Sequence, residues 1–275
     1  MITKEKIDNY IEKIPPSPKA LKETLTLLNN GELVKAAKVA QTDLALSAYL
    51  KSIVNRPIYG FKNSVSDISQ IFGILGVTGS QQAVYNYMMS LLSPNQWKLF
   101  GLNKSSFHTL QDALVIKWQM ILNHLKIESK DLQNAITLLP ASIIVSEALF
   151  CEHIKDVNLL RSAKALDYNT ILMRLCKVDL FDICEQISLK WEMPNEVAKV
   201  VQAASGVKPS EDAQMNTLGK WMHLLLFYEL SQPMFIEPGL EDFSLNSSRL
   251  CAMTGLCPLS CSSIAIDALC DLSSQ

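Results

Sequence analysis

The chain has 275 residues, 48% of them hydrophobic, with 25 Lys and Arg against 27 Asp and Glu and a formal net charge of −2. This length gives one large domain, or two packed ones, with ample apolar surface for a core. The composition excludes a disordered tail protein. The near-neutral charge, without a run of Lys or Arg, argues against nucleic acid as the main partner.

The first third of the chain predicts several short helices. Thr3 is the expected N-cap of the first helix, with Ile2 and Ile7 as a hydrophobic staple, and two prolines end this helix after Ile14. Ser17 is the expected cap of a second helix, which buries Leu21, Leu25 and Leu28. Further helices are expected at 32–40, around Leu46, Leu50 and Ile53, from a Ser66 cap to a Gly76 stop, and at 80–92, with a loop at 55–66.

The rest of the chain predicts longer helices and no strands. Expected helices cover 105–125, 132–150, 159–166, 170–191, 195–204 and 210–230. Because no stretch alternates apolar and polar residues, the expected fold class is all-α, with helices packed in layers. The expected domain is 1–240, with an N-terminal part at 1–92 and a second part at 93–240, followed by a Ser- and Cys-rich tail at 241–275.

The ends and the cysteines predict a cytoplasmic protein. Residues 1–6 are polar where a secretory signal would turn apolar, and seven cysteines give an odd number without a disulfide pattern. The most apolar stretch, 135–150, contains polar residues and Pro140, so a buried core helix is expected there and not a membrane span.

Motifs for common catalytic and metal sites are absent. The sequence has no P-loop, nucleophile elbow, zinc-protease or Cys-x-x-Cys motif. Glu147, Cys151, Glu152 and His153 could be drawn as a metal site, but only Glu147 and Cys151 would share a helix face. The tail cysteines Cys251, Cys257, Cys261 and Cys270 fit no standard zinc or iron–sulfur spacing, although four thiols could capture zinc if the tail folded back. We therefore predict neither a metal nor a cofactor.

Five short motifs occur in one order within the first third. They are Ile14 to Pro18 with its three prolines, the helix start at Asp43, Leu44 and Leu46, the loop from Asn55 to Tyr59 and Gly60, the helix start at Val65 to Ile68, and Ile74 to Val77 around Leu75 and Gly76. Together they resemble the HDOD family, bacterial all-α regulatory proteins related to the metal-dependent HD phosphohydrolases. Leu44 and Arg56 depart from the family's usual proline and serine. The resemblance covers about residues 14–230 and is strongest at its start.

The resemblance also implies which residues replace the ligands of the HD enzymes. Pro140 and Ala141 follow two leucines where those enzymes carry His and Asp, and Leu180 and the stretch 203–205 lie roughly where other histidines are expected. Trp191 and Pro194 match later family positions. Since Pro and Ala cannot bind a metal, the resemblance implies a non-enzymatic signal-transduction or regulatory protein acting through protein contacts.

One loop is the first place to seek a partner or ligand. It contains Asn55, Arg56, Tyr59, Gly60 and Phe61. Loops on rigid helices commonly carry recognition, although structural roles fit the motif residues as well: Asp43 as an acid in a first helical turn, Asn55 satisfying backbone groups, and Tyr59 packing across the loop.

Two other functions are kept as alternatives. A residual phosphohydrolase would use Asp112, His124, Glu147 and His153, which would have to converge. A nucleotide or cyclic-dinucleotide sensor would need stacking aromatics and an arginine, of which the sequence offers only Arg56, Arg161, Arg174 and Arg249. The protein partner is unidentified in each case, and a homo-oligomer is left open.

Overall fold

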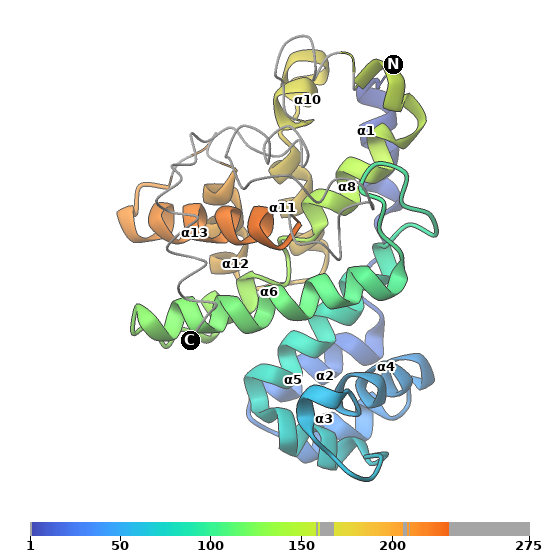
Figure 1. Cartoon of the computed structure of the whole chain (residues 1–275), viewed down its shortest axis with the longest axis vertical. Coiled ribbons are helices and arrows are strands. Elements are labelled where there is room, and N and C mark those ends of the chain that lie inside the picture. Colours follow the sequence, from blue (N-terminus) through green and yellow to red (C-terminus); the bar gives the residue numbers. More distant parts are fainter. Residues whose placement is uncertain (1, 158, 160–167, 206–207, 209, 231–275) are drawn as a thin grey trace. The chain divides into compact units, whose positions relative to one another are not determined.

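The computed structural model describes residues 2–157, 159, 168–205, 208 and 210–230. Every regular element in these ranges is a helix, which confirms the all-α prediction (Figure 1). The helices are α1 (Lys4–Lys13), α2 (Lys19–Asn29), α3 (Leu33–Ala40), α4 (Leu44–Val54), η1 (Pro57–Tyr59), α5 (Ile68–Leu92), α6 (Lys104–His124), α7 (Lys130–Ala135), α8 (Ala141–Phe150), η2 (Cys151–His153), α10 (Tyr168–Cys176), α11 (Leu180–Lys190), α12 (Asn195–Ala204) and α13 (Ala213–Leu230).

The chain divides into two compact units. One, the small unit, comprises residues 16–91, and the other, the large unit, combines residues 1–15 with the chain from 92 onward. The boundary near residue 92 is where the sequence divides the domain into two parts. The first helix differs from expectation, since α1 belongs with the later helices and not with the N-terminal part.

The small unit is a group of helices around a hydrophobic core. Helix α2 packs against α3 (Figure 1). The predicted leucine stripe of α2 is buried. The fully buried side chains of this core include Leu21, Leu28, Leu46, Leu50 and Phe72.

Two of the predicted N-caps in this unit are wrong. Ser17 does not cap α2: the N-cap is Pro18, whose carbonyl accepts hydrogen bonds from Leu21 and Lys22. Ser66 does not cap α5 either, because Asp67 directly precedes the first helical turn and its Oδ1 accepts from the Gln70 amide at 2.7 Å. A carboxylate also suits the positive end of the helix dipole.

Gly76 interrupts α5 as the sequence predicts. Its φ of 67° and ψ of −176° are non-helical, and residues on both sides are helical. This backbone region is open essentially to glycine alone, so a residue without a Cβ is required. The second half of α5 resumes directly after Gly76 and not at Ser80.

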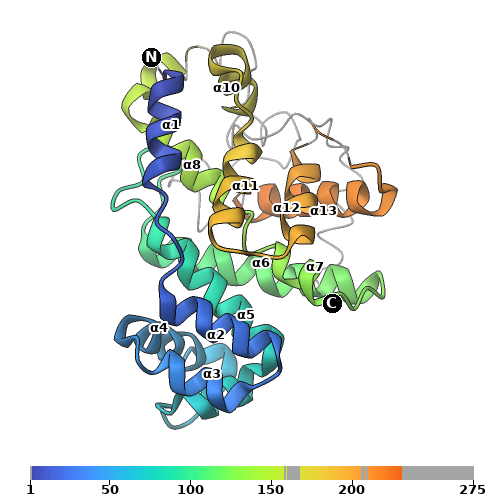
Figure 2. The same cartoon turned by 180° about the vertical axis from the view of Figure 1, so that it is seen from behind.

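Helix α1 is fixed within the large unit from several directions. Thr3 caps it as predicted, with the Lys6 amide 3.3 Å from Oγ1. At its other end the Lys190 ammonium of α11 donates to the carbonyls of Ile11 and Ile14 at 2.9 and 3.2 Å. Trp191 Nε1 donates to Pro15 O at 3.0 Å, and Figure 2 shows α1 beside α8 and α11.

Two long predicted helices are broken in the large unit. The stretch 132–150 divides into α7 and α8 at a turn that contains Pro140. The stretch 170–191 divides into α10 and α11, because Lys177 adopts a φ of 58° and Asp179 caps the next helix. The expected helix at 159–166 and the tail at 241–275 lie outside the described residues.

Helices α12 and α13 approach each other closely. A Cβ built on Gly219 of α13 would lie 2.7 Å from backbone atoms of Ala203 and Ala204, so only glycine fits at this crossing. Within the described ranges, none of the helices combines the length and apolar character needed to cross a membrane.

Candidate functional site

The loop after α4 is held closed by one side chain. Asn55 donates from Nδ2 to the carbonyls of Lys51 and Val65 at 2.8 and 2.9 Å, and its Oδ1 accepts from the Val65 amide at 2.7 Å. The expected backbone-binding role of this amide is confirmed. Since both ends of the loop meet at Asn55, residues 55–65 form a closed loop, called the Asn55 loop below.

Two aromatic rings of the Asn55 loop face solvent. Tyr59 and Phe61 are 37% and 45% exposed, and their rings stack with centroids 6.4 Å apart at an interplanar angle of 8°. Gly60 between them has a φ of 66°, which lets the chain turn so that the rings meet. Partial burial raises the pKa of the Tyr59 phenol, and the charge of Arg56 lowers it in part. The packing expected of Tyr59 is thus a stack on Phe61.

The two residues expected to replace the HD ligands lie in the interior of the large unit. Pro140 and Ala141 are buried in the turn that begins α8, where Pro140 O accepts from the Ile144 amide at 3.1 Å. The neighbouring Leu138 and Leu139 are fully buried. Neither the Pro140 nor the Ala141 side chain has a nitrogen, oxygen or sulfur atom, so the pair does not fit a metal ion.

The only acid of α8, Glu147, serves the backbone. Its side chain is buried, and its two oxygens accept from the successive amides of Lys98, Leu99 and Phe100 at 2.6 to 3.3 Å. Three amides that point at one carboxylate form an anion-binding arrangement. Glu147 therefore holds the segment 98–100 against α8.

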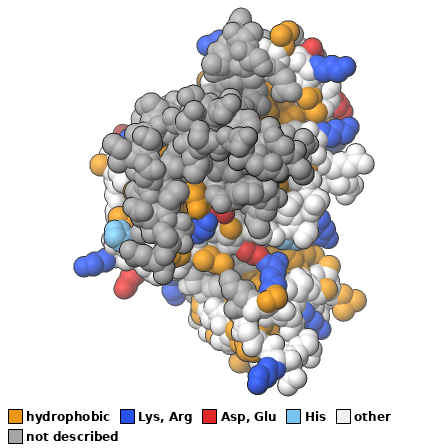
Figure 3. All heavy atoms as spheres, viewed as in Figure 1, with side chains coloured by type: hydrophobic (Ala, Val, Ile, Leu, Met, Phe, Trp, Pro, Cys, Tyr) orange, Lys and Arg blue, Asp and Glu red, His pale blue; other side chains and the backbone are white. Residues whose placement is uncertain are grey.

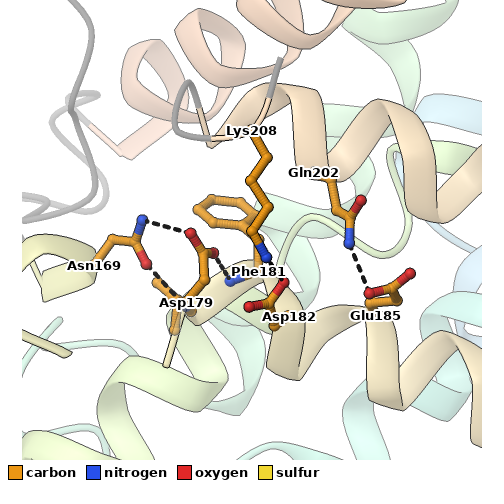
Figure 4. A network of polar contacts seen from close by, with 8 residues as sticks. Asn169, Asp179, Phe181, Asp182, Glu185, Gln202 and Lys208 are labelled. Carbon is orange, nitrogen blue, oxygen red and sulfur yellow. Dashed lines mark hydrogen bonds and ion pairs between the residues drawn. The ribbon is translucent and has the colours of Figure 1, made fainter. Parts of the chain in front are cut away.

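The positions near Leu180 form a polar network at the start of α11 (Figure 4). Asn169 Oδ1 accepts from the Leu180 amide at 2.6 Å, and its Nδ2 lies 3.3 Å from Asp179 Oδ2. Asp179 in turn caps α11 through the Phe181 amide at 2.7 Å. These side chains bind the first amides of α11, so the network stabilises the start of this helix.

Further along α11 the contacts in Figure 4 reach α12 and the segment after it. Gln202 Nε2 donates to Glu185 Oε2 at 2.7 Å, and Lys208 forms an ion pair with Asp182. The hydrogen bond from Lys208 to Asp182 raises the pKa of the Lys208 ammonium. Ala203 and Ala204, at the other expected histidine positions, pack against Gly219.

A shallow groove of about 430 Å³ lies between α1 and α8. It is lined by Thr3, Glu5, Lys6, Asn9, Tyr10, Lys13, Ala148 and Leu149. Lys6 pairs with Glu152 at 2.7 Å, and this hydrogen bond lowers the pKa of the Glu152 carboxyl. None of the residues selected from the sequence as a site lines this groove.

The residues of the alternative phosphohydrolase do not converge. Asp112 and His124 lie twelve residues apart on the continuous helix α6, which separates them by about 18 Å. Within the described ranges, no three His, Cys, Asp or Glu side chains gather in a way that could hold a metal ion. Arg174 lies exposed on α10. The four tail cysteines, Arg161 and Arg249 are outside the described residues.

Comparison with known sequences and structures agrees with the motifs. The HDOD domain model matches residues 14–206, which is most of the chain. The chain belongs to the HDOD domain family. A crystal structure of an HDOD domain protein with unknown function from Geobacter sulfurreducens has the same fold, with a TM-score of 0.62 and 12% sequence identity. The alignment covers 98% of this chain and 92% of that one. No curated protein matches the chain.

Sequence reasoning missed several contacts of this HDOD chain. The three amides around Glu147 and the carbonyls around Lys190 come from segments far away in the sequence, and no local pattern marks them. The Asn169 and Asp179 pair had a local signal, since Asp before an apolar run is an N-cap pattern. Helical periodicity continues across this pattern, so the periodicity predicts one long helix there.

Proposed function

We propose that this HDOD protein is a non-enzymatic regulator in a bacterial signalling pathway and that it acts through protein contacts in the cytoplasm. The observation that carries the proposal is the burial of Pro140 and Ala141, at the positions where the resemblance to the HD enzymes implies His and Asp. A hydrolytic metal must be held by donor atoms so that its bound water loses a proton near neutral pH. These two side chains supply none.

The surroundings support the same reading. Glu147, one helical turn and a half beyond Ala141, has its carboxylate engaged by three backbone amides. The backbone of Ala203 and Ala204 packs directly against Gly219 of α13. Cys151, Cys176 and Cys184 are free thiols in the described chain, which is consistent with a reducing compartment.

The experiment that tests this function measures metal and turnover on one sample of the full chain. Metal content is determined by inductively coupled plasma mass spectrometry, and hydrolysis is followed with bis(p-nitrophenyl) phosphate in the presence of added Mn²⁺ or Fe²⁺. We expect less than about a tenth of a metal per chain and no turnover above buffer. About one or two metals per chain together with turnover would overturn the proposal.

Further purification separates turnover by this chain from turnover by a contaminating enzyme. Turnover that disappears on further purification belongs to a contaminant and leaves the non-enzymatic proposal in place. Turnover that stays in constant ratio to the chain through every purification step belongs to the chain and overturns the proposal.

A further inference from the structure

We propose that the Asn55 loop is a docking surface for an acidic segment of a partner protein, one that carries an aromatic or large aliphatic residue among its acids. The inference rests on the proposed function, since it names the chemistry of the partner through which the regulator would act. Its parts are the closed backbone, the exposed rings and the sign of the charge.

The loop backbone is organised before any partner arrives. Asn55 ties residue 65 to the last turn of α4 through three hydrogen bonds. Val65 itself is buried, so the closing end of the loop is anchored in the core of the small unit. A loop already held in one conformation loses less entropy on binding than a flexible one, which favours affinity.

The rings supply the apolar contact. Tyr59 and Phe61 stack on each other and leave more than a third of each side chain exposed. Tyrosine at an interface offers a rigid apolar face together with a hydroxyl that can hydrogen-bond, and such aromatics contribute much of the binding energy in protein contacts. The matching feature on a partner is a side chain with a large apolar surface.

All charged residues in the loop and in the helix before it are positive. Residues 44–66 contain Lys51, Arg56 and Lys62 and no Asp or Glu. The two acids that flank the segment, Asp43 and Asp67, both accept hydrogen bonds from helix N-terminal amides, at 2.9 and 2.7 Å. The three cations outnumber the two flanking acids, so the complementary partner surface is negative.

The observations favour a protein over a nucleic acid. Binding along a phosphate backbone uses a groove or stripe of cations, commonly with about six to ten phosphate contacts. The segment has three cations, and on the face drawn in Figure 3 the described Lys and Arg side chains form separate small groups and not a band. A short acidic peptide needs fewer charges and one apolar pocket or ridge.

The test is a selection of random twelve-residue peptides, displayed on phage, against the full immobilised chain. Tyr59→Ala/Phe61→Ala is the variant used for counter-selection. We expect enriched peptides with several Asp or Glu around a Trp, Phe or Leu, and loss of their binding to the variant. Enrichment of basic or neutral peptides, or no enrichment over an uncoated surface, would overturn the proposal.

The best enriched peptide is then synthesised with a fluorescent label and titrated by anisotropy. Tyr59→Ala/Phe61→Ala should weaken binding at least tenfold, and Arg56→Gln/Lys62→Gln about threefold, with a reduced dependence on salt. The matched controls are Leu189→Ala, an exposed apolar residue of α11, and Lys4→Gln/Lys38→Gln, two exposed lysines outside the loop. Equal losses in the controls would place the binding elsewhere and refute the docking site.

A labelled dT12 oligonucleotide is titrated in parallel. Binding of the oligonucleotide that is tighter than that of the peptide and lost in the loop variants would mean that the loop serves nucleic acid, which contradicts the proposal. Circular dichroism confirms that each variant is folded. A chain with metal and turnover but intact peptide binding would refute only the regulatory function, whereas a chain with neither metal nor peptide binding would refute only the docking site.

Discussion

At the scale of single residues, the buried carboxylate of Glu147 accepts hydrogen bonds from several backbone amides. Its oxygens bind the amides of residues 98–100. Glu147→Ala would leave those amides without an acceptor inside the fold, and each unsatisfied buried group costs about 1–3 kcal/mol. We expect a loss of about 3 kcal/mol or more in the free energy of unfolding, measured with urea.

The control for this substitution is Glu128→Ala. Glu128 is exposed in the connection between α6 and α7, and its removal should change the free energy of unfolding by less than about 0.5 kcal/mol. Equal effects at the two positions would show that the contacts of Glu147 contribute nothing beyond the loss of a charge.

A second residue-scale prediction concerns the thiol of Cys184. Burial raises its pKa, and the nearby carboxylates of Asp179 and Asp182 raise it further. The thiolate is the reactive form, so Cys184 should resist iodoacetamide at pH 8.5 in the folded chain. Peptide mass spectrometry should show alkylation at less than about a tenth of the rate in guanidinium chloride.

The raised pKa of Cys184 also makes the stability of the folded chain depend on pH. Because the folded pKa of Cys184 lies above its unfolded value, the thiol stabilises the folded chain fully below that unfolded value. The stabilisation decreases as the pH rises above it, since unfolding then lets the thiol ionise. Fast labelling of Cys184 in the folded chain at pH 8.5 would show that the thiol is accessible and contradict its burial.

At the scale of elements, two glycines of α5 form a matched pair. Gly76 adopts a non-helical conformation with positive φ, and a Cβ would meet nothing within 4 Å at either Gly73 or Gly76. Gly76→Ala should therefore destabilise the chain by about 1–3 kcal/mol through backbone strain alone. Gly73→Ala should leave stability unchanged or raise it by about 0.5–1 kcal/mol, because alanine favours the helix. Thermal unfolding of the two variants measures the difference.

The order of the two effects decides the interpretation. If Gly76→Ala were as stable as Gly73→Ala, the break would not depend on glycine and α5 could continue through residue 76 as a regular helix. Local sequence does predict this break correctly, because the constraint is in the backbone of one residue and needs no distant partner.

At the scale of the whole molecule, α13 is tied to α6 by a shielded ion pair. Lys117 Nζ lies 2.6 Å from Glu229 Oε1 and 4.4 Å from the centre of the Tyr228 ring. Glu229 is almost completely buried. Lys117→Met keeps most of the length of the side chain but leaves the Glu229 charge without its cation. We expect a loss of about 2–4 kcal/mol in the free energy of unfolding in urea.

The double variant Lys117→Met/Glu229→Gln separates charge from packing. Replacing both charges should recover at least half of the loss, because no uncompensated carboxylate then remains buried. A double variant as unstable as Lys117→Met would assign the effect to packing against Tyr228. Lys117 lies within the match to the HDOD domain, whereas Tyr228 and Glu229 lie beyond its end at residue 206.

The sequence by itself determined the all-α class, the HDOD family and most helices of the described chain. Thr3 as a cap, Gly76 as a break and Asn55 as a backbone-binding amide were all predictable. Each depends on neighbours within about ten residues, which a local pattern contains. The Asn55 loop was also located as a candidate contact surface, and its role in binding stays a prediction.

Only the tertiary structure decided how distant segments use the polar residues. In the folded chain α1 belongs to the large unit, and Glu147 binds the amides of residues 98–100. Two helices predicted to be long are interrupted, one at the Pro140 turn and the other before Asp179. The physical reason is that a buried charge or carbonyl takes whatever partner the packing brings near it. Helical periodicity continues across such points, so the partners appear only once the chain is folded.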